Sequence, residues 1–135
     1  MEEARLLKDR GRFAFSMYAG GVAVEGMLRS LCCIESVAFD PRHELRKLAI
    51  RVKDLGLLRR ERDDDFVGAV NGVAKRWRNT LRYADQDHLE RFLKKTKAIR
   101  SKKDTPKTVC NEHFDQCSQV LKRCEVLWTR SRKES

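Results

Sequence analysis

One short segment gathers the side chains of this chain that could do chemistry. It reads Trp77-Arg78-Asn79-Thr80-Leu81-Arg82-Tyr83, and His88 follows shortly after. Arginine binds phosphate through a planar guanidinium group that keeps its charge, and histidine can move a proton near neutral pH. Together these side chains are what cleavage of RNA without a metal ion would need. The other interpretation is an ordinary helix end.

The charge of the chain favours an anionic partner. Lys and Arg number 30 against 20 Asp and Glu, which gives a formal net charge of +10, and most of the excess lies between residues 41 and 100. A basic surface attracts polyanions such as nucleic acid. The alternative is a solvated helical surface that is simply rich in Lys and Arg.

Length and composition predict a single all-α domain over residues 1–135. A chain of 135 residues can bury one core, and 41% hydrophobic with 37% charged residues suits a helix-rich globular protein. Few runs alternate with period two, which argues against sheet. Five cysteines in a chain without a recognisable signal peptide indicate a cytoplasmic protein with reduced thiols.

Hydrophobic periodicity and helix-end signals predict a helical bundle of four to five helices in up-and-down order. The stretch Phe13 to Leu31 is apolar almost all round, as expected of a central buried helix, and its charged residues argue against a membrane span. A turn is expected at Ala84–Gln86, with Asp87 and Glu90 as a capping box. The five expected helical segments cover residues 3–33, 41–55, 64–83, 88–99 and 108–130. Apolar residues at helical spacing predict the buried stripes of the second and third segments, which are Leu45, Leu48, Ala49 and Val52 and then Phe66, Val70, Val73, Trp77 and Leu81.

Glycines and cysteines inside these segments carry further predictions. Gly20, Gly21 and Gly26 predict close approach of another helix backbone, within the fold or across a dimer. In the last segment the cysteines recur every seven residues, and a zinc site with His113 can be imagined. The rise of a helix separates successive cysteines by about 10 Å, which favours core packing and no metal. The apolar stripe there comprises Cys110, His113, Phe114, Cys117, Val120, Leu121, Cys124, Leu127 and Trp128.

The candidate site residues depend on how the helices end. Arg78 and Arg82 are four residues apart and would share one face of the third helix. The turn at Ala84–Gln86 would leave Arg82 at a helix C-terminus and His88 at the next N-terminus, where both could reach one phosphate. The alternative is an arginine paired with an acid such as Glu25, together with a surface histidine. His43 either caps a helix start or helps to shape this site.

Three segments together resemble a HEPN domain (higher eukaryotes and prokaryotes nucleotide-binding). In residues 11–29 a small-residue stretch precedes Val24-Glu25 and a leucine followed by a basic residue, as in the first helix of that family. His43-Glu44-Leu45 is similar to the family's His-acid-Leu turn. Trp77 followed by Arg82-Tyr83 resembles its tryptophan with an Arg-Tyr pair. The resemblance spans residues 11–83.

The resemblance implies a bundle of four or five helices that usually forms a homodimer. Many members are metal-independent ribonucleases whose arginine and histidine form a composite site across the dimer. It therefore implies Arg82 and His88 as catalytic residues, with Arg78, Asn79, Tyr83 and His43 binding substrate. The expected reaction transfers the phosphodiester to the neighbouring 2′-hydroxyl, without a cofactor.

Two functions of different classes follow as hypotheses. The leading one is a cytoplasmic, dimeric HEPN-like protein that binds or cleaves RNA. The rival is a non-catalytic module that binds a nucleotide or a protein, and some HEPN proteins pair in this way with a nucleotidyltransferase, as in toxin-antitoxin systems. Tyr83 occupies the position after the arginine, where a polar residue is common in the family, and this favours the rival. Binding at a membrane surface is the weakest hypothesis, because the basic residues are spread over several helices.

Overall fold

The computed structural model describes residues 1–33, 44–58 and 63–134, and within these ranges the chain is all-α with no strand. The elements are six α-helices and one short 3-10 helix, η2. The all-α class predicted from the sequence is therefore confirmed for the described residues. In chain order they are α1 (Glu2–Asp9), α2 (Phe13–Cys32), α3 (Leu45–Asp54), α4 (Asp63–Arg76), η2 (Asn79–Tyr83), α5 (Gln86–Lys95) and α6 (Pro106–Glu134).

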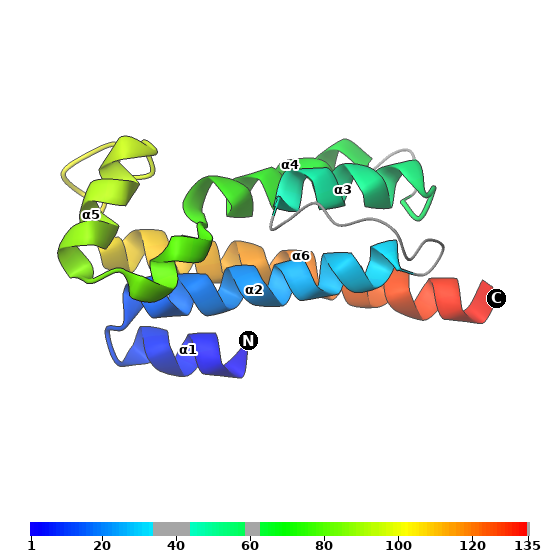
Figure 1. Ribbon diagram of the computed structural model, residues 1–135, viewed down its shortest axis with the longest axis horizontal. Coiled ribbons are helices and arrows are strands. Elements are labelled where there is room, and N and C mark those ends of the chain that lie inside the picture. The colour runs from blue at the N-terminus through cyan, green and yellow to red at the C-terminus, as the bar shows by residue number, and fades with distance from the viewer. Residues whose placement is uncertain (34–43, 59–62, 135) are drawn as a thin grey trace.

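Helix α2 is the centre of the fold, and α6 is its most extensive partner. Figure 1 shows α1 on one side of the α2–α6 pair, α3 and α4 on the other, and α5 across one end. Helices α2, α3 and α6 run in one direction in that view and α1 and α4 in the other, so the expected up-and-down order is not kept between α2 and α3. Among the described residues, no helix has the length and apolar character needed to cross a membrane.

The first predicted helix is wrong in one respect, because the structure divides it into α1 and α2. Gly11 has a φ of +72°, a left-handed conformation that glycine adopts at little cost and that ends α1. The chain then reverses, and the Ser16 hydroxyl donates a hydrogen bond to the Ala4 carbonyl at 2.6 Å. The hydrophobic pattern alone does not indicate this break, because apolar residues continue on both sides of it.

The ends of the later helices also differ from the prediction. The expected start of the second helix at Pro41 lies outside the described residues, and α3 begins at Leu45. Helix α4 ends at Arg76 and not at Tyr83, and α5 ends at Lys95 and not at Ile99. The predicted buried stripes are nevertheless confirmed, because the burial pattern continues where the helices stop. Their buried members include Leu45, Leu48, Ala49, Val52, Phe66, Val70, Val73, Trp77 and Leu81.

The packing of α2 on α6 explains one of the glycines. A Cβ atom on Gly20 would lie 3.2 Å from the Cys117 Sγ of α6, a distance tighter than ordinary van der Waals contact. His113 of α6 is 1% exposed, and its Nε2 lies 3.0 Å from the Met17 carbonyl oxygen of α2. At Gly20 the neighbour is therefore a side chain of α6 and not a helix backbone, and a Cβ atom on Gly26 would meet nothing within 4 Å, so the predicted backbone approach is wrong at these two glycines.

The cysteines of α6 belong to the core, as the stripe predicts. Cys110, Cys117 and Cys124 are buried and free. Burial raises the pKa of the Cys117 and Cys124 thiols to about 12, so they stay protonated. No three metal-ligating side chains in the described ranges converge in a way that could hold a metal ion.

The buried imidazole of His113 predicts a loss of stability in mild acid. Desolvation lowers its pKa to about 4 from 6.5, because the interior disfavours the charged ring. The unfolded chain therefore binds the proton first, and stability is full above about pH 6.5 and falls as the pH drops toward 4. At 1.36 kcal/mol per pKa unit, this group removes up to about 3 kcal/mol.

Urea denaturation at several pH values measures this effect, with His113→Gln as the comparison. Glutamine can still donate to the Met17 carbonyl but does not titrate. The free energy of unfolding of the variant should fall less between pH 7 and pH 5 than that of the wild type. Parallel curves for the two proteins would contradict the assignment.

Candidate functional site

Trp77 anchors the segment that carries the candidate site. Its side chain is 3% exposed, and its indole Nε1 donates a hydrogen bond to the Tyr18 carbonyl of α2 at 3.2 Å. The ring fills the space beside Gly21, where a Cβ atom would overlap the ring atoms of Trp77. Helix α4 ends at Arg76, directly before this contact, and the chain continues into η2.

The Arg78 guanidinium group caps the C-terminal end of α4. It has extended backbone angles, φ −141° and ψ 143°. Its Nη1 donates to the carbonyl oxygens of Ala74, at 3.1 Å, and Trp77, at 3.0 Å, which a C-terminal helix turn leaves without partners. Arg78 and Arg82 therefore do not share one face of a helix, and that prediction is wrong.

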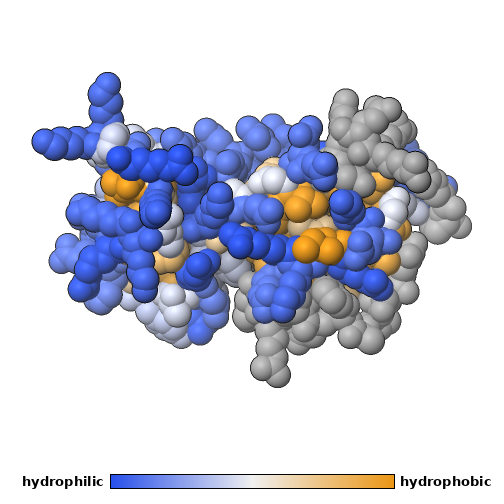
Figure 2. All heavy atoms as spheres, turned by 90° about the horizontal axis from the view of Figure 1, so that it is seen from above, coloured by the Kyte–Doolittle hydropathy of each residue, from blue (hydrophilic) through white to orange (hydrophobic). Residues whose placement is uncertain are grey.

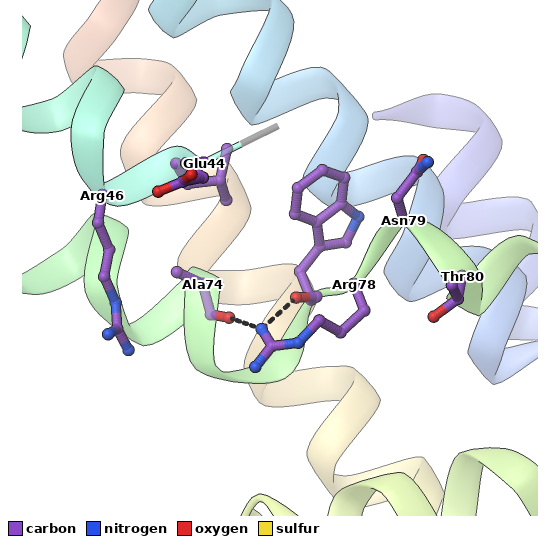
Figure 3. A pocket seen from close by; sticks show the side chains of 8 residues that line it. Glu44, Arg46, Ala74, Arg78, Asn79 and Thr80 are labelled. Carbon is purple, nitrogen blue, oxygen red and sulfur yellow. Dashed lines mark hydrogen bonds between the residues drawn. The ribbon is translucent and has the colours of Figure 1, made fainter. Parts of the chain in front are cut away.

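A pocket of about 520 Å³ lies between the start of α3 and the end of α4. Figure 3 shows the Arg78 side chain reaching the Ala74 carbonyl, with Glu44 and Arg46 across from it. Its volume is in the range of small-ligand sites. Two predicted substrate-binding residues, Arg78 and Asn79, line it, whereas His43 lies outside the described residues.

Arg82 and Tyr83 form an exposed pair at the end of η2. The guanidinium carbon of Arg82 lies 4.5 Å from the centre of the Tyr83 ring, a cation–π contact. Tyr83 is 76% exposed, the largest exposure among the large apolar side chains that the structure describes. Arg82 is also exposed and does not pair with Glu25, whose carboxylate accepts a hydrogen bond from Arg29 at 2.8 Å.

His88 lies in the first turn of α5 and is oriented by Asp85. One carboxylate oxygen of Asp85 accepts the His88 backbone N–H at 2.8 Å and lies 2.6 Å from the ring Nδ1. These hydrogen bonds lower the pKa of Asp85 and keep it ionised. The carboxylate favours the tautomer with its proton on Nδ1, which leaves Nε2 as the basic nitrogen. The imidazole remains 64% exposed.

The predicted turn between Arg82 and His88 is confirmed at Ala84 and Asp85, whereas Gln86, which was expected to belong to it, is already the first residue of α5. Ala84 and Asp85 are non-helical, and Asp85 is the N-cap of α5. The expected capping box at Asp87 and Glu90 is wrong, because the cap lies two residues earlier. Within the described ranges no hydrogen bond or ion pair joins Arg82 to His88, and their joint action on one phosphate stays a prediction.

Asp85 is the functional residue that the sequence interpretation missed. The Asp-x-x-His spacing is the signal, because a cap at Asp85 places His88 three residues into the helix, where both its N–H and its ring can reach the carboxylate. Asp85 also borders a hollow of about 190 Å³ shared with Arg12 and the start of α2. Asp85, and not the His88 side chain, contributes to the lining of this hollow.

Comparisons with protein-family models, with curated proteins and with solved structures find no match for this chain.

The cap assignment predicts different effects for two neighbouring aspartates. Asp85→Ala should lower the free energy of unfolding by about 1 kcal/mol, because the first N–H groups of α5 lose their acceptor. Asp85→Asn keeps an acceptor and should stay close to the wild type. Asp87→Ala serves as the control and should change stability by only a few tenths of a kcal/mol, about the size of a helix-dipole effect.

Urea denaturation of the three variants measures these differences. If Asp87→Ala lowers the free energy of unfolding more than Asp85→Ala does, the N-cap is Asp87, as expected from the sequence, and the assignment to Asp85 is wrong.

Proposed function

We propose that this protein binds RNA through Arg82, Tyr83 and His88 and cleaves it without a metal ion. The observation that carries the proposal is the exposed Asp85–His88 pair directly after the Arg82–Tyr83 stack. Neither Arg82 nor the His88 imidazole is buried in the core. A phosphate carrying an adjacent base would meet a cation, an aromatic face and an oriented proton acceptor.

In the proposed reaction His88 acts as the general base. Its Nε2 takes the proton of the ribose 2′-hydroxyl while Asp85 holds the Nδ1 side of the ring. The 2′-oxygen forms a bond to phosphorus, and the bond from phosphorus to the 5′-oxygen breaks. The products are a 2′,3′-cyclic phosphate and a 5′-hydroxyl, whose oxygen takes a proton from a protonated His88 of the second copy in a dimer.

Arg82 and Tyr83 would bind and stabilise rather than transfer protons. A guanidinium group beside the phosphate stabilises the charge that grows on its oxygens in the transition state. The exposed Tyr83 ring offers a stacking surface for a base, which is worth about 1–3 kcal/mol per base. The net charge of +10 would draw the strand to the protein.

One contact in the structure supports the resemblance to HEPN domains. Gly21, in the first of the resembling segments, packs against Trp77, in the last. The two patterns therefore describe neighbouring parts of the structure, which supports a shared architecture. We accordingly propose a homodimer in which two Arg82 and His88 pairs meet.

The pocket at Trp77 favours a second candidate function, a non-catalytic nucleotide-binding module. It has room for a small ligand, an apolar floor and the polar residues Arg78, Asn79 and Thr80. A nucleotidyltransferase-type protein is the proposed partner in that case. A rise in melting temperature with ATP, GTP or oligoadenylate, lost in Asn79→Ala and retained in His88→Ala, would support this function over cleavage.

Incubation of the purified protein with single-stranded and structured RNA in the presence of EDTA tests the catalytic proposal. Loss of a general base and of a phosphate ligand should reduce the rate of the Arg82→Ala, His88→Ala double variant by at least about 100-fold. Lys95→Ala is the matched control, since it also removes one formal positive charge, from the opposite end of the helix that carries His88, and it should keep most of the activity.

Equal cleavage by wild type and double variant would exclude Arg82 and His88 as the catalytic residues. Detection of the cyclic phosphate on the 5′ fragment checks the chemistry independently of the rate.

A further inference from the structure

A basic cavity lies next to the last turn of α4. It is distinct from the pocket at Trp77, because the two share no lining residue. It has a volume of about 360 Å³ and is bordered by α4, the connection between α5 and α6, and α6. Four cationic side chains line it, and Figure 2 shows hydrophilic residues covering most of the end of the molecule where α5 lies. The charged residues at the cavity are Lys75, Arg76, Lys97, Arg100, Asp104 and Glu112.

The two acids at this cavity are already engaged. Asp104 accepts hydrogen bonds from the backbone N–H groups of Arg100, at 2.9 Å, and Ser101, at 3.1 Å. Glu112 pairs with Arg76 at 3.1 Å. By contrast, neither Lys75 nor Lys97 forms an ion pair with any residue that the structure describes. The cavity therefore has four cationic and two anionic side chains, and it keeps an excess of positive charge.

Arg76 gives the cavity a fixed wall. Its Nη1 donates to the Gln116 side-chain oxygen at 2.6 Å, and its side chain is only 20% exposed. The Gln116 amide fits there because Gly72 has no side chain, since a Cβ atom at Gly72 would lie 2.8 Å from the Gln116 oxygen. Gly72, Gln116 and Glu112 thus hold a guanidinium group in place at the edge of the cavity.

Lys97 occupies a position where glycine would be more stable. Its φ is +58°, the left-handed conformation that ends α5, with the Ala98 N–H donating to the Leu93 carbonyl at 2.9 Å. A residue with a Cβ atom pays a conformational cost there. Residues in such strained conformations are found at functional sites. The Lys97 side chain lines the basic cavity, which suits a role in binding.

We propose that this cavity binds a phosphate group, supplied by an RNA strand or by a free nucleotide, through Lys75, Lys97 and Arg100. The site is separate from Arg82, Tyr83 and His88 and does not require that they cleave RNA. For an RNA strand it would be a second point of attachment, beyond the last turn of α4.

Lys97→Gly separates this role from a structural one. The substitution relieves the backbone and should raise the melting temperature, while it removes the ammonium group and should weaken phosphate binding. A merely structural residue would not move the two readouts in opposite directions. Lys97→Gln tests the charge alone, and Lys95→Gln, from the last turn of α5 but outside the cavity, is the matched control.

Binding is measured with a 2′-O-methyl RNA oligonucleotide, which cannot be cleaved, and separately with ATP and inorganic pyrophosphate. Loss of one phosphate contact should weaken RNA binding about fivefold at about 0.1 M salt, from the release of one counter-ion. We expect that loss in Lys97→Gly and Lys97→Gln and little change in Lys95→Gln. Binding of ATP or pyrophosphate alone, weakened by the Lys97 variants, would assign the cavity to free phosphates and count against RNA as ligand.

Two results would overturn the proposal. One is an equal loss in Lys95→Gln, which would mean that only overall charge matters. The other is an unchanged affinity of both Lys97 variants for all three probes. Cleavage of ordinary RNA by the Lys97 variants is read separately, so that failure of the catalytic proposal stays distinguishable from failure of this one.

Discussion

The contact between Trp77 and Gly21 is the constraint on which the rest of the site depends. An indole needs a space that only a residue without a side chain leaves on α2, and its N–H needs the Tyr18 carbonyl as acceptor. Both conditions fix the position of Trp77, the first residue after the end of α4 at Arg76. The residues that follow are therefore presented from a short 3-10 turn and the start of α5, on a surface rather than along a helix.

The three arginines that flank Trp77 in sequence differ in their contacts. Arg76, on the last turn of α4, is tied to Gln116 and Glu112 of α6. Arg78 satisfies carbonyl groups at the helix end. Arg82, in η2, contacts the exposed Tyr83 ring and forms no ion pair with any residue that the structure describes. A guanidinium group that is not needed for the fold is the one best placed for a ligand, and this is why our functional proposal centres on Arg82.

The sequence predicts the class of the fold and most of its core, because burial leaves a periodic pattern. The stripes from Leu45 to Val52 and from Phe66 to Leu81 are buried as expected. The ends of the helices are predicted less well than the buried stripes. The break at Gly11 has a local signal, since glycine in a left-handed conformation commonly ends a helix. The end of α4 at Arg76 lies directly before the contact of Trp77 with the distant Gly21, which no local propensity contains. The role of Asp85 was missed for the same reason, since it follows from where α5 begins.

The measurement that tests the central claim most directly is a titration of the labelled protein with 2′-O-methyl RNA, followed by two-dimensional NMR. The account predicts that the amide signals of Arg82, Tyr83 and His88 shift with added RNA, while the indole N–H signal of the buried Trp77 changes little. Shifts that leave these three residues unchanged and gather elsewhere would contradict it.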